Sequence, residues 1–235
     1  MKRGGGVIKR KEELGMEIEL KYLFDTDARG GEDAGTKRAS VEKIKNEIFA
    51  DEEVVRFMDA GSEEVIPMDA IYLDTADGAL RKKGIAFRVR QEGSQPVATL
   101  KWGGKQEAGL HVRGELNVSV SEDFVKAPSL AIFQGSEIYA ELAGFEESLI
   151  PVMEMKFTRR QVRLDTGLSI SEMSLDEGEI ITINGNEPIL ELEIELYAGD
   201  QEDMIALGGR LEEKYHLKKG LTSKFQRGLA LLGEK

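Results

Sequence analysis

A strict alternation of charged and apolar side chains marks the stretch Met16-Glu17-Ile18-Glu19-Leu20-Lys21-Tyr22 near the start of the chain. Successive side chains of a β-strand point to opposite faces, so this stretch predicts a strand with one charged and one apolar face. A late stretch, Glu191-Leu192-Glu193-Ile194-Glu195, repeats the pattern with three carboxylates on one face. We therefore expect that strands near both ends of the chain carry acidic faces.

Most of the remaining chain also alternates with the period of a strand. Further candidate strands span residues 69–74, 85–91, 96–102, 110–120, 152–165, 168–175, 179–183 and 188–198. Glycine-containing pairs separate them at residues 77–78, 92–93, 103–104, 166–167, 177–178 and 184–185. Asn184-Gly185 is the strongest hairpin signal, because both residues tolerate the positive φ of a type I′ turn. Nine strands in meander order predict a barrel or a sandwich.

Helices are few in this pattern. Apolar residues recur at helical spacing over residues 40–58, and residues 128–145 and 203–215 are two further helical segments. Residues 1–14 contain three consecutive glycines and five basic side chains without periodicity, so we expect a flexible leader. Residues 15–235 show no break in composition, and we expect a single domain there.

Composition excludes several classes of protein. The chain has 44 Asp and Glu against 32 Lys and Arg, which gives a net charge of −12 and argues against a broadly basic nucleic-acid surface. There is no cysteine, and the only histidines are His111 and His216, so thiolate chemistry and His-rich metal sites are excluded. No apolar run is long enough to span a bilayer, and the first residues lack the apolar core of a signal peptide. We expect a cytoplasmic protein without membrane or nucleic-acid partners.

If the strands close into a barrel, alternate residues of each strand point inward. The charged faces of the middle strands then contribute Arg88, Arg90, Lys101, Arg113 and Glu115 to the interior. One alternative is that these are the solvated faces of half-buried strands. Carboxylates, however, gather on the first and last strands and basic residues on the middle ones. An acidic side facing a basic side suits a metal-bound polyphosphate.

The ordered motifs resemble those of the CYTH superfamily, the triphosphate tunnel metalloenzymes. Glu17-Ile18-Glu19-Leu20-Lys21 matches the ExExK signature of that family, and the similarity extends over residues 16–233. The other matching motifs begin at Tyr72, Gly84, Thr99, Glu172, Leu175, Glu191 and Ser223. The motifs look most like those of bacterial inorganic triphosphatases, which often carry a C-terminal CHAD domain, and we expect this chain to lack that domain.

The resemblance implies a mainly β (α+β) fold, a closed eight-stranded antiparallel β-barrel with a few surrounding helices. It also implies a triphosphate substrate and one or two Mg²⁺ or Mn²⁺ ions. The metal ligands would be Glu17, Glu19, Asp176, Glu193 and Glu195, with the two glutamate pairs facing each other across the barrel. The phosphate ligands would be Lys21, Arg88, Arg90, Lys101, Arg113 and Arg159, although the sequence leaves Arg159 and Arg160 open. Lys224 matches a basic position that reaches the triphosphate or a catalytic water.

Hydrolysis of inorganic tripolyphosphate is the first functional prediction. Aromatic residues make up only 6 % of the chain and form no obvious base-stacking cluster, which disfavours cyclisation of ATP. Hydrolysis of an organic triphosphate such as thiamine triphosphate, and non-catalytic binding of polyphosphate or nucleotide, stay open as alternatives. The segment 30–37 is a near miss for a P-loop that we reject, because Glu32 and Asp33 would repel phosphates. His111 and His216 are interpreted as surface or hydrogen-bonded polar residues.

Overall fold

Eight antiparallel strands form a closed β-barrel in the computed structural model, which describes residues 12–24, 34–142, 144–145 and 149–233. The barrel strands are β1 (Glu12–Leu23), β2 (Glu64–Thr75), β3 (Ile85–Glu92), β4 (Gln95–Glu107), β5 (Leu110–Ser119), β6 (Leu149–Asp165), β7 (Ser169–Thr182) and β8 (Gly185–Gly199). Their order is β5-β4-β3-β2-β6-β7-β8-β1, and pairing of β1 with β5 closes the ring. The predicted eight-stranded barrel is therefore confirmed, and the open alternative of a sandwich is wrong. A two-residue strand, β9 (Lys218–Lys219), adds to β1.

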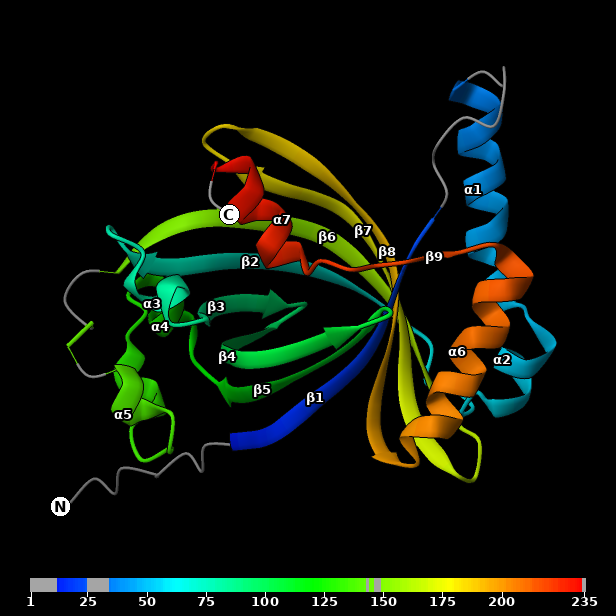
Figure 1. The fold of residues 1–235 in the computed structure, drawn as a ribbon, viewed down its shortest axis with the longest axis horizontal. Coiled ribbons are helices and arrows are strands. Elements are labelled where there is room, and N and C mark those ends of the chain that lie inside the picture. Colours follow the sequence, from blue (N-terminus) through cyan, green and yellow to red (C-terminus); the bar gives the residue numbers. More distant parts are fainter. Residues whose placement is uncertain (1–11, 25–33, 143, 146–148, 234–235) are drawn as a thin grey trace, which may run out of the picture.

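Helices lie outside the barrel on two sides, and one further helix lies against β7 and β8 (Figure 1). They are α1 (Ala34–Phe49), α2 (Glu52–Phe57), α3 (Ala79–Lys82), α4 (Glu122–Lys126), the 3₁₀ turn η1 (Leu130–Phe133), α5 (Tyr139–Leu142), α6 (Gln201–Tyr215) and α7 (Lys224–Leu231). Among the described residues, no helix combines the length and the apolar character needed to cross a membrane.

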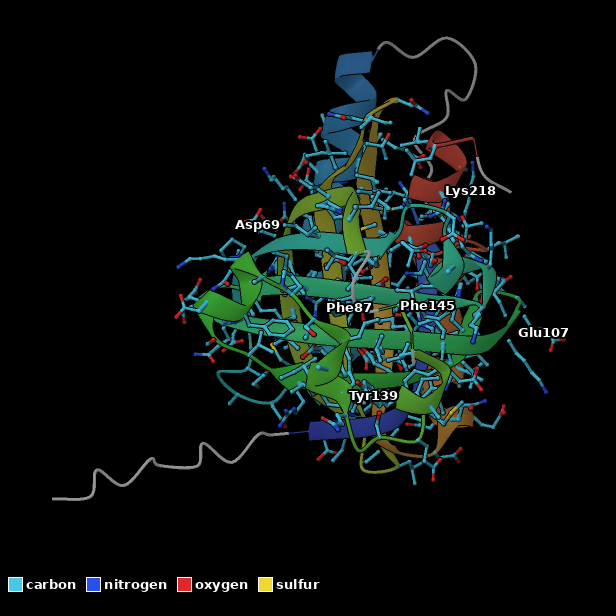
Figure 2. The ribbon with its side chains drawn as sticks, turned by 90° about the vertical axis from the view of Figure 1, so that its left-hand side faces the viewer. Asp69, Phe87, Glu107, Tyr139, Phe145 and Lys218 are labelled. Carbon is cyan, nitrogen blue, oxygen red and sulfur yellow. The ribbon has the colours of Figure 1, made fainter. Side chains whose placement is uncertain are left out.

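The apolar faces of the strands point outward, under the helices. Leu192 and Ile194 of β8 are fully buried in one cluster with Met204 and Leu207 of α6. A second cluster covers β3, β4 and β5, where the Phe87 ring meets the Phe133 ring edge-on at 5.7 Å. Figure 2 shows the segment that carries Tyr139 and Phe145 lying over the strands near Phe87. Because helices bury the apolar faces, the charged faces are left to point inward.

The predicted break at Glu177-Gly178 is wrong, because β7 runs through it without interruption. A Cβ atom at position 178 would lie 2.1 Å from the Lys156 carbonyl oxygen of β6. Gly178 is therefore needed for close approach of two strands and not for a turn. The residues predicted as two strands, 168–175 and 179–183, form one.

Two other glycine-containing pairs that were predicted to separate strands differ from the prediction in the structure. Gly103 and Gly104 do not end β4, because they form an irregularity in its pairing with β5 between Trp102 and Lys105. The predicted β7–β8 hairpin is confirmed, but Thr182 pairs with Gly185, so the turn residues are Ile183 and Asn184. Among the described residues, neither Ile183 nor Asn184 has a positive φ, so the predicted type I′ turn at Asn184-Gly185 is wrong.

The predicted helix over residues 40–58 is two helices, because Asp51 caps the start of α2 by accepting a hydrogen bond from the Glu53 amide. The segment 128–145 contains only the short η1 and α5, whereas α6 matches the helix predicted at 203–215. The structure has β1 beginning at Glu12, inside the range assigned to a leader; residues 1–11 and 25–33 lie outside the described residues.

Candidate functional site

A cavity of about 850 Å³ occupies the inside of the barrel. Its lining carries eight basic and seven acidic side chains: Lys21, Arg88, Arg90, Lys101, Arg113, Arg159, Arg163, Lys224, Glu17, Glu19, Glu92, Glu115, Glu172, Glu193 and Glu195. The cavity wall is thus close to neutral although the whole chain carries a net charge of −12. The predicted ionic interior is present, and the solvated-face alternative is wrong for these strands.

The structure brings together almost all residues that the sequence assigned to the site. The six predicted phosphate ligands, Lys224 and four of the five predicted metal ligands line the cavity. The fifth, Asp176, is fully buried in the wall and contacts Arg159 and Lys224. Arg159 is the inward arginine of β6, because Arg160 lies outside with its guanidinium 3.9 Å from the centre of the Phe49 ring.

The carboxylates form two separate groups. The first acidic group is Glu17, Glu115 and Glu195, and the second is Asp176, Glu191 and Glu193; within each, one oxygen per residue lies within 4.8 Å of the others. The expectation that the glutamate pairs of β1 and β8 face each other across the barrel is wrong. Glu19 is directly opposite Glu195 in the pairing of these neighbouring strands, so the pairs lie side by side.

Two members of the first acidic group contact cations. The Lys101 ammonium lies 2.7 Å from Glu17 and 3.3 Å from Glu115, and the Arg88 Nη2 lies 3.9 Å from Glu115. Arg113 pairs with Glu17 as well, and its Nη2 is 3.2 Å from Glu19. Glu195, by contrast, has no ion pair within the described part of the chain. Burial, followed by the negative charges of Glu17 and Glu115, raises the pKa of Glu195 to about 8.

Four cations surround the second acidic group. Arg159 makes a bidentate contact with Asp176, with Nε and Nη2 each 2.7 Å from a carboxylate oxygen. The Lys224 ammonium is 2.8 Å from Asp176 and 3.0 Å from Glu193. Lys21 and Arg227 complete the set, with nitrogens 3.3 and 3.0 Å from Glu191.

These cations determine the protonation state of the second group. Burial acts to raise the pKa of Glu193, but the charges of Lys21, Lys224 and Arg159 outweigh it and hold the pKa well below its usual value. The pKa of Asp176 is also lowered, since Arg159 and Lys224 outweigh its burial. All three carboxylates are already paired with cations. The second acidic group therefore has its charge compensated by the protein itself.

The basic side of the cavity comes from β3, β4 and β5. Arg88 is buried and donates from Nη2 to the Thr99 hydroxyl at 3.2 Å, but its Nε has no acceptor among the described residues. Burial and the neighbouring charge of Arg88 lower the pKa of Arg90, which shows how crowded these cations are. A buried donor without a partner is costly, so this side is suited to an oxygen-rich anion.

Several site residues were missed by reasoning on the sequence. Glu115 was placed inside the barrel but not among the metal ligands, and Arg227 was not assigned a role. Tyr72 also lines the cavity, and the charges of Arg88, Lys101 and Arg113 outweigh its burial and lower its pKa. Arg227 lies on α7, a helix whose Ser223–Gln226 capping box was visible in the sequence. His111 is buried with Nε2 2.9 Å from the Gly220 carbonyl oxygen, and His216 is exposed.

The donor set of the first acidic group fits a hard divalent cation. It supplies only carboxylate oxygens, which Mg²⁺ and Mn²⁺ prefer, and its oxygens converge within 4.8 Å. Glu195 contacts no cation among the described residues, and a divalent ion would offset the burial and the repulsion that raise its pKa. The three residues therefore fit such an ion in number and chemistry.

Comparison with known proteins identifies the family. The CYTH domain model matches residues 43–229. An inorganic triphosphatase of Haemophilus influenzae is 32 % identical over 164 residues, which are 70 % of this chain and 45 % of that protein. The chain thus spans about half the length of this curated relative.

Two solved structures share the fold. One is the "putative adenylyl cyclase" of Hippeastrum, described as having a dominant triphosphatase activity, with a TM-score of 0.62 and 17 % identity over 93 % of this chain and 97 % of that one. The other is the PH1819 protein of Pyrococcus horikoshii, with a TM-score of 0.51 and 18 % identity over 93 % of this chain and 99 % of that one. With the ExExK motif on β1, the charged cavity and the family match over most of its length, the chain belongs to the CYTH domain family.

Proposed function

We propose that this chain hydrolyses tripolyphosphate inside the barrel with the help of Mg²⁺ or Mn²⁺. Tripolyphosphate presents many oxygens and a high negative charge, and the basic side of the cavity presents Arg88, Arg90, Lys101 and Arg113 to it. Family membership and the similarity to a triphosphatase support the same reaction class. Cytoplasmic location and the absence of nucleic-acid and membrane partners stay predictions from the sequence.

The unpaired Nε of Arg88 is the observation that carries this proposal. This nitrogen is buried, so leaving it without a hydrogen-bond acceptor costs about 1–3 kcal/mol unless a ligand supplies one. The Thr99 hydroxyl already accepts from Nη2 of Arg88 and donates to Asn117 at 2.7 Å, so it does not satisfy the Nε. A phosphate oxygen would satisfy the Nε and gain a charge-assisted hydrogen bond.

The metal ion would be held by Glu17, Glu115 and Glu195, the group in which Glu195 has no ion pair among the described residues. When bound, a divalent ion polarises phosphate oxygens and lowers the pKa of a coordinated water. Glu19, Asp176 and Glu193 are also metal ligands in the prediction from sequence. Asp176 and Glu193 belong to the second acidic group, which four cations surround, and Glu19 belongs to neither group. We therefore assign the ion to the first acidic group, and we assign the second group to holding Arg159 and Lys224 in place.

The residues of this chain then have separable tasks. Arg88, Arg90 and Lys101 neutralise phosphate oxygens, and Lys224 presents its ammonium from the α7 end of the cavity. Water oxygen bonds to a terminal phosphorus while that phosphorus loses its bond to the bridging oxygen, and the products are phosphate and pyrophosphate. Cations fixed in advance around the developing charge lower the barrier without reorganising during the reaction.

The test is release of phosphate from tripolyphosphate, ATP and thiamine triphosphate, side by side, with Mg²⁺, Mn²⁺ or EDTA. Metal-dependent release with tripolyphosphate as the best substrate supports the proposal. Cyclic AMP as the main product from ATP, with tripolyphosphate left intact, would replace hydrolysis by cyclisation. Metal-dependent binding of tripolyphosphate without any turnover would indicate a binding protein.

A further inference from the structure

The chain passes from the outside of the barrel to its inside between α6 and α7. Residues 216–223 form this connection, which we call the strap. Its β9 pairs with the end of β1, and the Gly220 amide donates to the Lys21 carbonyl oxygen at 2.8 Å. Figure 1 shows the strap leaving α6 and crossing β1 on its way to α7. Because Ser223 and Lys224 line the cavity, the strap delivers both residues to the proposed phosphate site.

The strap lies directly on an inward-facing residue of β1. A Cβ atom at Gly220 would lie 2.6 Å from Cγ of Lys21, so the backbone of the strap touches the stem of this lysine. The Lys21 ammonium in turn contacts Glu193 of the second acidic group. A side chain at position 220 would push the strap away from the barrel, and glycine is therefore needed here for a close approach.

His111 of β5 contacts the same glycine. Its Nε2 lies 2.9 Å from the Gly220 carbonyl oxygen, and the contact is buried. A carbonyl oxygen only accepts hydrogen bonds, so Nε2 of His111 carries the hydrogen and donates it. His111 shares the inward face of β5 with Arg113, but among the described residues that line the cavity only Arg113 of this pair is present. His111 therefore reaches the strap and not the substrate.

Two exposed residues separate Gly220 from Ser223, the residue that caps α7. They are Leu221, which is 57 % exposed, and Thr222. The Ser223 hydroxyl accepts from the Gln226 amide and so fixes the start of the helix. A glycine backbone has many accessible conformations unless a contact selects one. The position of the Gly220 carbonyl thus determines where the chain enters α7.

Lys224 lies between the His111 contact and the contacts that hold α7. On its C-terminal side, the Phe225 ring stacks on Tyr72 with centroids 5.0 Å apart. On its N-terminal side, the hydrogen bond from His111 fixes the strap. The Lys224 ammonium lies 3.0 Å from Glu193, an arrangement that a shift of the strap would disturb. Small displacements of a group that binds the reacting substrate are costly for catalysis.

We propose that His111 is a positioning residue for Lys224: its hydrogen bond to Gly220 fixes the strap and thereby the ammonium that Lys224 presents to the triphosphate. The proposal rests on the proposed triphosphatase function and adds to it a residue that does not touch the substrate. If the hydrogen bond served only the stability of the fold, the effect of its loss on catalysis would not depend on Lys224.

The test is a double-mutant cycle on hydrolysis of tripolyphosphate with His111→Leu and Lys224→Ala. His111→Leu removes the donor and is expected to lower kcat/KM by about 5- to 100-fold. In the Lys224→Ala background the same substitution should change kcat/KM by less than about twofold, because the residue that His111 positions is gone. His111→Gln retains an amide donor and should recover most of the activity. The control is His216→Asn, because His216 is an exposed residue of the strap with a φ of 53° that asparagine tolerates.

Hydrogen exchange of the strap measures its order independently of turnover. The peptide that contains residues 217–223 should exchange faster in His111→Leu than in the wild type and in His216→Asn. Unchanged exchange, unchanged kinetics, or an equal fall in kcat/KM in both Lys224 backgrounds overturns the proposal. If His111→Leu does not fold, His111→Asn, whose shorter amide does not reach Gly220, takes its place in the cycle.

Failure of the proposed function gives a different result. If the wild-type protein hydrolyses no triphosphate, the proposed function fails, and the same cycle is measured as calorimetric binding of tripolyphosphate. A loss of affinity in His111→Leu that disappears in the Lys224→Ala background still supports the positioning role. No loss of affinity, or equal losses in both backgrounds, contradicts it.

Discussion

The two acidic groups of the cavity have the same number of carboxylates but opposite electrostatic situations. Asp176, Glu191 and Glu193 are surrounded by four lysine and arginine side chains. In the other group, Lys101, Arg113 and Arg88 contact Glu17 and Glu115, whereas Glu195 has no ion pair among the described residues. We therefore expect an unpaired carboxylate, and not carboxylates alone, to mark the metal site.

This contrast arises from which elements surround each group. The second acidic group lies where α7 and β6 meet β7 and β8, so Lys224 and Arg227 enter from the helix and Arg159 from the strand. The first acidic group lies where β1 and β8 no longer pair, and in the described part of the chain no helix contributes a cation to it. Buried carboxylates that are paired with cations are held in one arrangement, whereas an unpaired carboxylate is open to contact with a ligand.

Chelation should have the largest effect. If the first acidic group holds an essential ion, EDTA should abolish phosphate release from tripolyphosphate, and added Mn²⁺ should restore it. The measurement is initial rate against free metal concentration. Turnover that EDTA does not diminish would show that Glu17, Glu115 and Glu195 do not hold an essential metal ion.

Removing a charge from the second acidic group should destabilise the fold. In Asp176→Asn, Arg159 and Lys224 lose a buried partner, and we expect the free energy of unfolding to fall by about 3–5 kcal/mol. Urea unfolding in EDTA measures it, with Asp123→Asn as the control because the Asp123 side chain is 91 % exposed. A more stable Asp176→Asn protein would mean that the second group also carries excess negative charge in the absence of metal.

The stability of the folded protein should depend on pH through Glu195 of the first acidic group. The pKa of Glu195 in the folded state, about 8, lies above the ordinary value of 4.5. Its contribution to stability is therefore complete below about pH 4.5 and is lost as the pH rises through about 8. In EDTA, stability should fall between pH 5 and 9 by on the order of 3 kcal/mol.

Glu195→Gln should remove this part of the pH dependence, and Glu193→Gln should not. Thermal unfolding across the pH range in EDTA provides the measurement. A wild-type protein whose stability does not change between pH 5 and 9, or an unchanged pH dependence in Glu195→Gln, would contradict the assignment of this pH dependence to Glu195.

The smallest expected effect concerns the basic side of the cavity. Arg90→Ala should remove one charge-assisted contact, worth about 1.5–3 kcal/mol, and so lower kcat/KM for tripolyphosphate by about 10- to 150-fold. Steady-state kinetics measure it, with Arg210→Ala as a matched control whose exposed arginine pairs with Glu53 on the surface. Equal kinetics in Arg90→Ala and the wild type, with the fold intact, would remove Arg90 from the phosphate site.

The period of two along the strands was enough to predict which charges point inward. Glu17, Arg88 and Glu193 all lie where alternation places them, because a one-residue shift would expose an entire apolar face. Gly178 misled the prediction, since one glycine serves equally well at a turn or at a close contact between strands. Turn position also escaped prediction at Asn184, where the hairpin was correct and its register was not.

The division of the carboxylates into two groups could not be predicted from alternation. Glu115 joins Glu17 and Glu195 only because β5 closes the barrel by pairing with β1, a contact between distant parts of the chain. The neutralisation of Glu193 likewise depends on Lys224, which reaches it from α7, 31 residues further along the chain. Local pattern specifies the face of a residue, and tertiary pairing specifies its neighbours.

Binding of Mn²⁺ to Glu195→Gln and Glu193→Gln, each titrated by calorimetry in the absence of substrate, tests the central claim most directly. If the unpaired Glu195 carboxylate marks the metal site, Glu195→Gln should weaken Mn²⁺ binding by at least about tenfold, as does loss of a metal ligand or of a residue that orients one. Glu193→Gln should bind Mn²⁺ within about threefold of the wild type, because its carboxylate is occupied by Lys21, Lys224 and Arg159. Weak binding in Glu193→Gln together with normal binding in Glu195→Gln would contradict the account.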